Sequence, residues 1–126
     1  MDGRVININP FLRFILVNFI ICPTRSFSST KVYKEVWDKN TGSPLLHNTT
    51  KLSEKLGNKL EDYDVYYAMR YQNPSIESVI NNILETNPDE ITVLPLFPHY
   101  AAATTGSVYQ EISRIVSKKW VVPNIR

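Results

Sequence analysis

The chain has 126 residues, of which 43% are hydrophobic and 21% charged, and its net charge is +2 at neutral pH. This length suits a single domain with a real core, and the composition is ordinary for a soluble globular protein. The net charge is small and the lysines and arginines are scattered, so the composition does not indicate nucleic-acid binding. The single cysteine, Cys22, cannot form an internal disulfide, so we interpret it as a small buried hydrophobe in a reducing compartment.

The first predicted element is an apolar helix. Asn9 and Pro10 are a helix-start signal, with asparagine as the cap and proline at the first helical position. We expect this helix to run to about Ile21 and to stop before Pro23. Residues 11–22 are strongly apolar, but they are fewer than the roughly 20 that a membrane span needs. Such a helix could be buried, line an apolar pocket or rest peripherally against a membrane, whereas the signal for a cleaved leader is weaker.

Two further helices are expected before the middle of the chain. A loop after Pro23 carries Arg25, and a short helix follows from about Ser28, with an apolar stripe that ends at Trp37. The Ser43-Pro44 pair, again a cap and a proline, begins a third helix. Its apolar face is modest, so we expect it to cover a sheet at the surface of the protein.

The second half of the chain alternates helical and strand patterns. Strands are expected over 64–69, which is rich in β-branched and aromatic residues, over the apolar run 91–97, and over 120–122. The run 91–97 is typical of a strand buried on both faces. Helices are expected from Asn73-Pro74 to about residue 87 and over 106–117. This alternation predicts parallel strands joined by right-handed crossovers, and therefore an α/β fold. The predicted buried stripes of the two helices are Ile76, Val79, Ile80, Ile83 and Leu84, and Val108, Ile112, Ile115 and Val116.

Polar and aromatic side chains follow two of the predicted strands. Arg70 and Tyr71 come after the first, and His99 comes after the second, shortly before a helix that opens at about Gly106. Ligands of open α/β sheets bind beyond the carboxyl ends of the strands, and a helix N-terminus with its free N–H groups suits a carboxylate or phosphate. The residues therefore predict a site for an anionic organic ligand.

Simpler interpretations of these residues stay open. Arg70 could pair with a helix acid such as Glu77, His99 could be a structural or surface residue, and the segment 104–107 could be only a helix cap. The sequence contains no phosphate-binding GxxxxGK[ST] or GxGxxG pattern, no cysteine–histidine metal spacing and no evident nucleophile–base pair. His47 has no visible partner and is given no role.

Three blocks of the sequence resemble the ferrochelatases. Residues 41–46, Thr-Gly-Ser-Pro-Leu-Leu, resemble the family's Gly-Gly-Ser-Pro-Leu segment. Residues 69–74, Met-Arg-Tyr-Gln-Asn-Pro, resemble its Met-Arg-Tyr-x-x-Pro block. Residues 94–107 resemble its Leu-Pro-Leu-Tyr-Pro-Gln-Tyr-Ser-x-x-Thr-Thr-Gly-Ser block, with histidine where many members have glutamine and Ala101 in place of the usual serine. Order and spacing agree over nearly the whole chain.

The resemblance implies a fold and an activity. Ferrochelatases have two similar lobes, each with a parallel sheet flanked by helices, and they insert ferrous iron into protoporphyrin IX to form haem. Iron and porphyrin are substrates, and the resemblance implies no bound cofactor and no resident metal. Porphyrin contacts are implied, by position in the family or by place at the strand ends, for Arg25, Tyr33, Ser43, Arg70, Tyr71 and His99.

Departures from the family limit what we expect of this chain. The family's catalytic histidine lies in a Ser-x-His-Gly motif of the second lobe, with an acidic partner further on, and neither is found in this sequence. The family's Asn-x-Gly-x-Pro loop is missing too. We therefore expect residues 1–126 to be an incomplete N-terminal lobe, without the first strand and the entire second lobe, marginally stable and inactive in iron insertion by itself.

Two other functions remain open at this point. The chain could be a non-catalytic tetrapyrrole-binding or interaction module, or part of a chelatase for another metal. The expected location is cytoplasmic with peripheral membrane contact through residues 11–22, and the sequence leaves the oligomeric state open.

Overall fold

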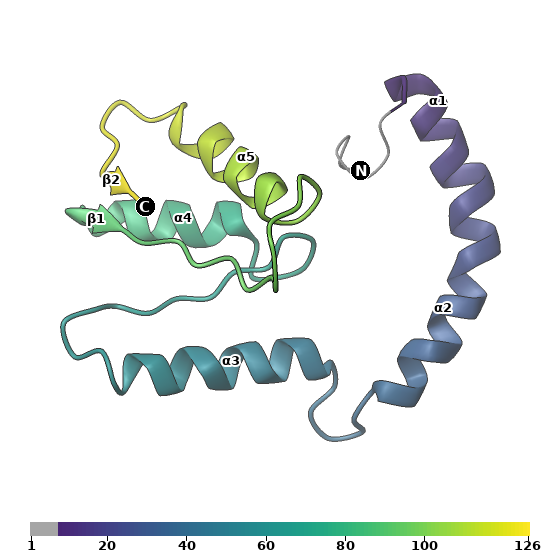
Figure 1. The fold of residues 1–126 in the computed structure, drawn as a ribbon, viewed down its shortest axis with the longest axis horizontal. Helices are drawn as coiled ribbons and strands as arrows, with labels where there is room; N and C mark the ends of the chain where they lie inside the picture. Colours follow the sequence, from purple (N-terminus) through teal and green to yellow (C-terminus); the bar gives the residue numbers. More distant parts are fainter. Residues whose placement is uncertain (1–7) are drawn as a thin grey trace. The chain divides into compact units, whose positions relative to one another are not determined.

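A computed structural model describes residues 8–126, which form two compact units, residues 8–65 and Tyr66–Arg126 (Figure 1). The first unit contains α1 (Pro10–Ile15), the π-helix η1 (Leu16–Ile21), α2 (Cys22–Val36) and α3 (Pro44–Gly57). The second contains α4 (Ile76–Glu85), β1 (Glu90–Ile91), α5 (Thr105–Val116) and β2 (Asn124–Ile125).

The first three elements form one continuous helix, Pro10–Val36, visible from purple to blue in Figure 1. The predicted start is confirmed, because the Asn9 side chain accepts a hydrogen bond of 2.9 Å from the backbone N–H of Phe11. The predicted stop before Pro23 is wrong. The backbone widens into the π-helical turn of η1, where the N–H of Cys22 donates to the carbonyl of Val17, five residues earlier. The wider turn accommodates a proline that lacks an N–H of its own.

The structure of this helix corrects two sequence-based expectations. Arg25 lies on α2 and not in a loop, and Cys22 is exposed where a buried residue was expected. The stripe that ends at Trp37 is exposed as well, with 54–65% of each residue accessible at Val32, Tyr33, Val36 and Trp37. Within the described residues, Pro10–Val36 is one helix that is long and apolar enough to cross a membrane, judged by length and composition alone.

A tight turn connects α2 to α3. The Asp38 carboxylate accepts hydrogen bonds from the backbone N–H groups of Asn40 (2.8 Å) and Thr41 (2.7 Å), and Asp38 and Gly42 form an antiparallel bridge. Gly42 has φ +74°, a conformation that residues with a side chain rarely adopt. Ser43 then caps α3, as predicted. No α3 residue is buried, so its apolar face covers no sheet within the described part of its unit.

The core of the second unit lies between α4 and α5, which run side by side in Figure 1. Ser75 caps α4 by accepting from the N–H of Ser78, so the helix begins two residues after the predicted Asn73-Pro74 signal. The predicted stripes are confirmed, with only Val79 outside the core. The buried core residues are Ile76, Ile80, Ile91, Ile112 and Ile115, with Ile83, Leu84, Val93, Val108, Val116 and Ile125 packed against them.

The strands β1 and β2 come before and after α5 in the sequence, and they pair with each other in parallel. This pairing confirms the α/β class. Glu90 is in register with Asn124, and Ile91 with Ile125. The Arg126 N–H donates to the Ile91 carbonyl at 3.0 Å, and the Val93 N–H donates to the Arg126 carbonyl at 2.8 Å. A parallel connection through a helix is the arrangement that the alternating pattern predicted.

The extent of the strands differs from the prediction. Residues 64–68 form no ladder, and Met69 makes only an isolated bridge to Ser75. The run 91–97 is not buried on both faces, because Ile91 is buried whereas Leu94 and Leu96 are 72% and 59% exposed. Trp120 is fully exposed, and the last strand begins only at residue 124.

Candidate ligand-binding site

The centre of the candidate site is a hydrogen bond between Arg70 and Ser107. The Nε–H of Arg70 donates to the Ser107 hydroxyl oxygen at 2.8 Å, across 37 residues of sequence. Arg70 follows the extended segment that ends at Met69, and Ser107 lies in the first turn of α5. The sequence-based expectation that these two segments come together is therefore confirmed for Arg70 and the start of α5.

An ion-pair network extends from Arg70 along α5. A terminal nitrogen of Arg70 lies 3.9 Å from Glu111, which accepts two hydrogen bonds from Arg114, at 2.8 and 3.2 Å. Arg114 also donates to Glu77 on α4 at 2.9 Å. The hydrogen bonds to Glu111 and Glu77 raise the pKa of Arg114 above its ordinary value. Arg70 thus pairs with Ser107 and Glu111, and the acid considered from the sequence, Glu77, pairs with Arg114.

Tyr71 forms the aromatic side of the site. The Cζ atom of Arg70 lies 4.9 Å from the centre of the Tyr71 ring, within the range of a cation–π interaction. Tyr71 is 65% exposed, whereas the Arg70 side chain keeps 23% of its surface accessible. Together they present a guanidinium beside an accessible aromatic ring, a combination that can contact an anion and a flat apolar body.

The N-terminus of α5 differs from the predicted anion site. The N–H of Gly106 donates to the Ala101 carbonyl at 3.1 Å, and the N–H of Ser107 donates to the Thr104 carbonyl at 3.0 Å. The Thr104 hydroxyl also donates to the Ala101 carbonyl, at 3.2 Å. A local turn therefore uses N–H groups that were expected to be free for a ligand, and the positive charge of the site comes from Arg70.

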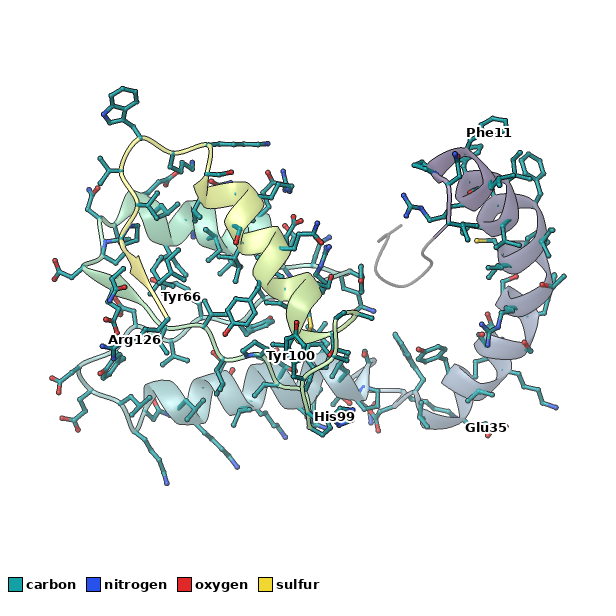
Figure 2. The ribbon with its side chains drawn as sticks, turned by 45° about the horizontal axis from the view of Figure 1, so that its top comes forward. Phe11, Glu35, Tyr66, His99, Tyr100 and Arg126 are labelled. Carbon is teal, nitrogen blue, oxygen red and sulfur yellow. The ribbon has the colours of Figure 1, made fainter. Side chains whose placement is uncertain are left out.

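His99 and Tyr100 lie on the loop before α5, where Figure 2 shows them as neighbours. Both are exposed, and Tyr100 has 70% of its surface accessible. His99 makes no hydrogen bond or ion pair with any residue in the range 8–126. The structure brings Arg70, Tyr71 and Ser107 together, and His99 does not join that network.

The other three candidates belong to the first unit. Arg25 and Tyr33 are exposed on α2, eight residues apart, which is about 12 Å along a helix axis. Ser43 caps α3, and its hydroxyl accepts from the N–H of Leu46 at 3.5 Å. This bond gives Ser43 a structural role as the cap at the start of the helix.

Sequence reasoning did not single out Glu111 and Arg114. Their spacing of three residues on a predicted helix is the signal that could have found them, because such residues are neighbours on a helix surface. Ser107 and Glu111, spaced by four, lie on the same face for the same reason. The connection of that face to Arg70 spans 37 residues and has no local sequence signal.

Other features of the second unit lie apart from this network. An open groove of about 690 Å³ runs past the end of α4 and is lined by residues that include Leu84, Pro88, Trp120 and Pro123. It contains none of the six candidate residues. Among residues 8–126 there is no group of three His, Cys, Asp or Glu side chains that could hold a metal ion.

Comparison with known proteins identifies the family. The ferrochelatase family model matches residues 1–126, the whole chain. The chain belongs to the ferrochelatase family. The resemblance of the three sequence blocks is thus confirmed, and the candidate site occupies two of them: Arg70 and Tyr71 in the Met-Arg-Tyr block, and Ser107 at the end of the Thr-Thr-Gly-Ser block.

Individual ferrochelatases are similar over almost the full chain. A ferrochelatase of Francisella tularensis subsp. novicida is 48% identical over 126 residues, which cover 99% of this chain and 38% of that protein. A ferrochelatase of Francisella tularensis subsp. tularensis is 47% identical with the same coverage. The chain therefore spans about two fifths of the length of these curated relatives. No solved structure gives a significant match.

Proposed function

We propose that this chain contributes part of the porphyrin-binding surface of a ferrochelatase, the enzyme that inserts ferrous iron into protoporphyrin IX to form haem. The observation that supports the proposal is the family match over residues 1–126, together with 48% identity to a ferrochelatase. Metal insertion replaces two pyrrole N–H protons by one ferrous ion, so an enzyme for this reaction needs a grip on the macrocycle and a group that accepts protons.

The chain's own residues suit the first of these tasks. A porphyrin is a flat apolar ring with two propionate groups, and Arg70 beside the accessible Tyr71 ring offers a cation next to an aromatic face. Arg25, Tyr33, Ser43 and His99 remain proposed contacts by their positions in the family's sequence pattern. Holding the ring in one orientation lowers the entropy cost of the chemical step that follows.

The second task needs residues that the sequence does not contain. It has no Ser-x-His-Gly motif, which carries the proton-accepting histidine in the family. We therefore propose that residues 1–126 are an incomplete N-terminal lobe that binds porphyrin and does not insert iron when isolated. The test has two measurements on the purified chain: quenching of protoporphyrin fluorescence, expected to saturate, and anaerobic ferrous insertion, expected to stay at the rate without protein.

The two measurements separate the alternatives. Metal insertion above the uncatalysed rate would contradict the proposed inactivity and would place a proton acceptor within these residues. Absence of saturable porphyrin binding would contradict the proposed binding role and favour an interaction module. Binding without insertion is the expected result.

A cytoplasmic location with peripheral membrane contact through residues 11–22 is part of the proposal. It is supported by Phe11, Phe14 and Phe19 on the first helix, which are 70%, 62% and 71% exposed (Phe11 is labelled in Figure 2). Flotation with vesicles of neutral and anionic lipid is expected to carry the wild-type chain, and Phe19→Asp should reduce the bound fraction. Phe27→Asp is the control further along the same helix, and an equal loss in both variants would count against contact through residues 11–22.

A further inference from the structure

The sheet of the second unit has an open edge on β1. The Ile91 carbonyl accepts a hydrogen bond of 3.0 Å from the Arg126 N–H, and the Val93 N–H donates to the Arg126 carbonyl at 2.8 Å, so both residues face β2. Backbone groups of successive strand residues point to opposite sides, so those of Thr92 and Leu94 face away from β2. In the described part of the chain, the backbone N–H and carbonyl groups of Thr92 and Leu94 make no hydrogen bond. These two residues form the open edge of β1.

The side chains of this edge are accessible as well. Side chains alternate between the two faces of a strand, and Ile91 is buried in the core with α4 and α5. Thr92 is exposed, and Leu94 keeps 72% of its surface accessible. An accessible apolar side chain beside unpaired backbone groups is typical of an edge that can bind another strand.

Proline distinguishes this edge from the outer edge of β2. The N–H of Asn124 donates toward β1, so Pro123 and Ile125 belong to the outer edge, where Pro123 has no N–H to donate. On the other strand, Pro95 alternates with Leu94 and falls on the side of β2, so it removes no donor from the open edge. Prolines and lysines commonly protect sheet edges, and the open edge of β1 contains neither.

We propose that the open edge of β1 binds a second copy of this chain, with the two strands antiparallel and centred on Val93. Thr92 of one copy then lies opposite Leu94 of the other, and each such pair exchanges both of its backbone hydrogen bonds. A twofold axis relates the copies, so the same surface is used by both and the assembly closes as a dimer. This self-association does not depend on porphyrin binding.

A second copy is the occupant that the chemistry of the edge favours. Strand pairing needs an extended partner with free backbone groups and no opposing charge, and the open edge itself has these properties. Around Val93, the Leu94 side chains of the two copies become diagonal neighbours about 7–8 Å apart. Glu90, the nearest acid, accepts a hydrogen bond of 2.8 Å from Asn124 and lies about 20 Å along the strand from Glu90 of the other copy. Like charges therefore do not face each other.

The test measures association of the whole chain and locates the contact. Because the edge is short, we expect a weak dimer with a Kd of about 0.1–1 mM. Sedimentation equilibrium should fit a monomer and a dimer with no larger species. Hydrogen exchange followed by NMR should then slow about two- to fivefold at the amides of Thr92 and Leu94 as the concentration rises through the Kd. The amide of Val93 is the internal control, because it donates to Arg126 within one copy and should change less.

Charged variants test the register. Thr92→Lys and Leu94→Glu each place like charges of the two copies near one another, so each is expected to weaken self-association about three- to tenfold. A mixture of the two variants brings the introduced ammonium opposite the introduced carboxylate, and should associate within about threefold of the wild type. Thr86→Lys is the matched control, because it adds the same charge at an exposed threonine that ends α4. Its Kd should equal that of the wild type.

Several results would overturn the proposal. A chain that stays monomeric up to about 1 mM, or that forms open-ended assemblies, has no closed pairing at this edge. Equal losses in Thr92→Lys and Thr86→Lys would make the effect one of net charge. A mixture that associates no better than its two components would exclude the register around Val93. Phe27→Asp changes an exposed residue of α2 and should leave the Kd unchanged, whereas a dimer lost there and retained in Thr92→Lys would be assigned to the first unit.

Discussion

Arg114 on α5 donates to the carboxylate of Glu77 on α4 over 2.9 Å, and so links the two helices of the core at their surface. The two side chains are 41% and 52% exposed, and the same guanidinium holds Glu111. The ion pair therefore lies at the edge of the buried interface between α4 and α5, where solvent screens it.

Loss of Glu77 should weaken the second unit slightly and in a salt-dependent way. Exposed ion pairs contribute little, because water and salt screen them. Glu77→Gln is expected to lower the urea midpoint a little at low ionic strength and not at all in about 1 M salt. Glu85→Gln, on the same helix but near its C-terminus, is the control and should lower neither midpoint. A salt-independent loss would assign Glu77 a packing role instead.

Truncation of Ile115 should be far more damaging. Ile115 is 2% exposed and belongs to the cluster between α4 and α5. Ile115→Ala removes buried methyl groups and leaves a cavity, so the free energy of unfolding should fall by about 2–4 kcal/mol. Val121→Ala, at a residue 78% exposed, is the matched control and should change it by less than about 0.5 kcal/mol. Similar losses in both variants would contradict the assignment of the core.

Substitution of Gly42 should destabilise the turn before α3. An added Cβ would lie 3.7 Å from the Trp37 ring, an ordinary contact, so the cost comes from the backbone at φ +74°. Gly42→Ala is expected to cost about 1 kcal/mol in the free energy of unfolding of the first unit. Gly57→Ala, at a helical glycine with a nearest contact of 3.9 Å, should be neutral or stabilising. The reverse order of the two variants would count against the left-handed turn.

The same turn should respond to acid through Asp38. Hydrogen bonds from the backbone N–H groups of Thr41 and Asn40 lower the pKa of Asp38 from its ordinary value of 3.8. Because the pKa of Asp38 is lower in the folded state than in the unfolded state, its ionised carboxylate stabilises the folded turn above pH 3.8. This stabilisation is lost as the pH falls through the lowered pKa of the folded state. The amide shifts of Thr41 and Asn40 should therefore titrate with a midpoint below 3.8. The titration should vanish in Asp38→Asn, and a midpoint above 3.8 would contradict these hydrogen bonds.

Replacement of Pro23 should remove the reason for the π-helical turn. Pro23→Ala restores a backbone donor, so η1 is expected to become regular α-helix. The free energy of helix formation should become more favourable by less than the roughly 3 kcal/mol that proline costs in a helix interior. Circular dichroism should then report more helix, and the amide of Thr24 should exchange more slowly. Pro10→Ala is the control, because proline at the first turn of a helix is well tolerated. An unchanged spectrum in Pro23→Ala would assign the π turn another cause.

Local patterns predicted the helices better than the strands. The stripes of α4 and α5 follow the helical period, so the burial of Ile80 and Ile112 could be predicted from spacing alone. A strand depends on a partner, and residues 64–68 have a strand-like composition without forming a ladder. The prediction at Pro23 was wrong because a proline usually indicates the end of a helix. Here the helix continues through Pro23 by means of a wider, π-helical turn, which the sequence pattern alone does not indicate.

The candidate site could be predicted in part. Arg70 and the start of α5 were expected to meet, because both follow predicted parallel strands. The sequence could not choose between Glu77 and Glu111 as the acid near Arg70, since both lie on predicted helices. The choice depends on how α4 and α5 pack, and that packing places Arg114 between the two acids.

The parallel pair of β1 and β2 sets an order of events in folding. Glu90 and Asn124 are 34 residues apart, so their strands can meet only after the intervening chain has been brought back on itself. Contacts of this range form late unless a packed element shortens the search, and α5 is that element. We therefore expect the strand pair to assemble after α5 has docked on α4. In native-state hydrogen exchange, the amides of Val93 and Arg126 should open before those inside α5.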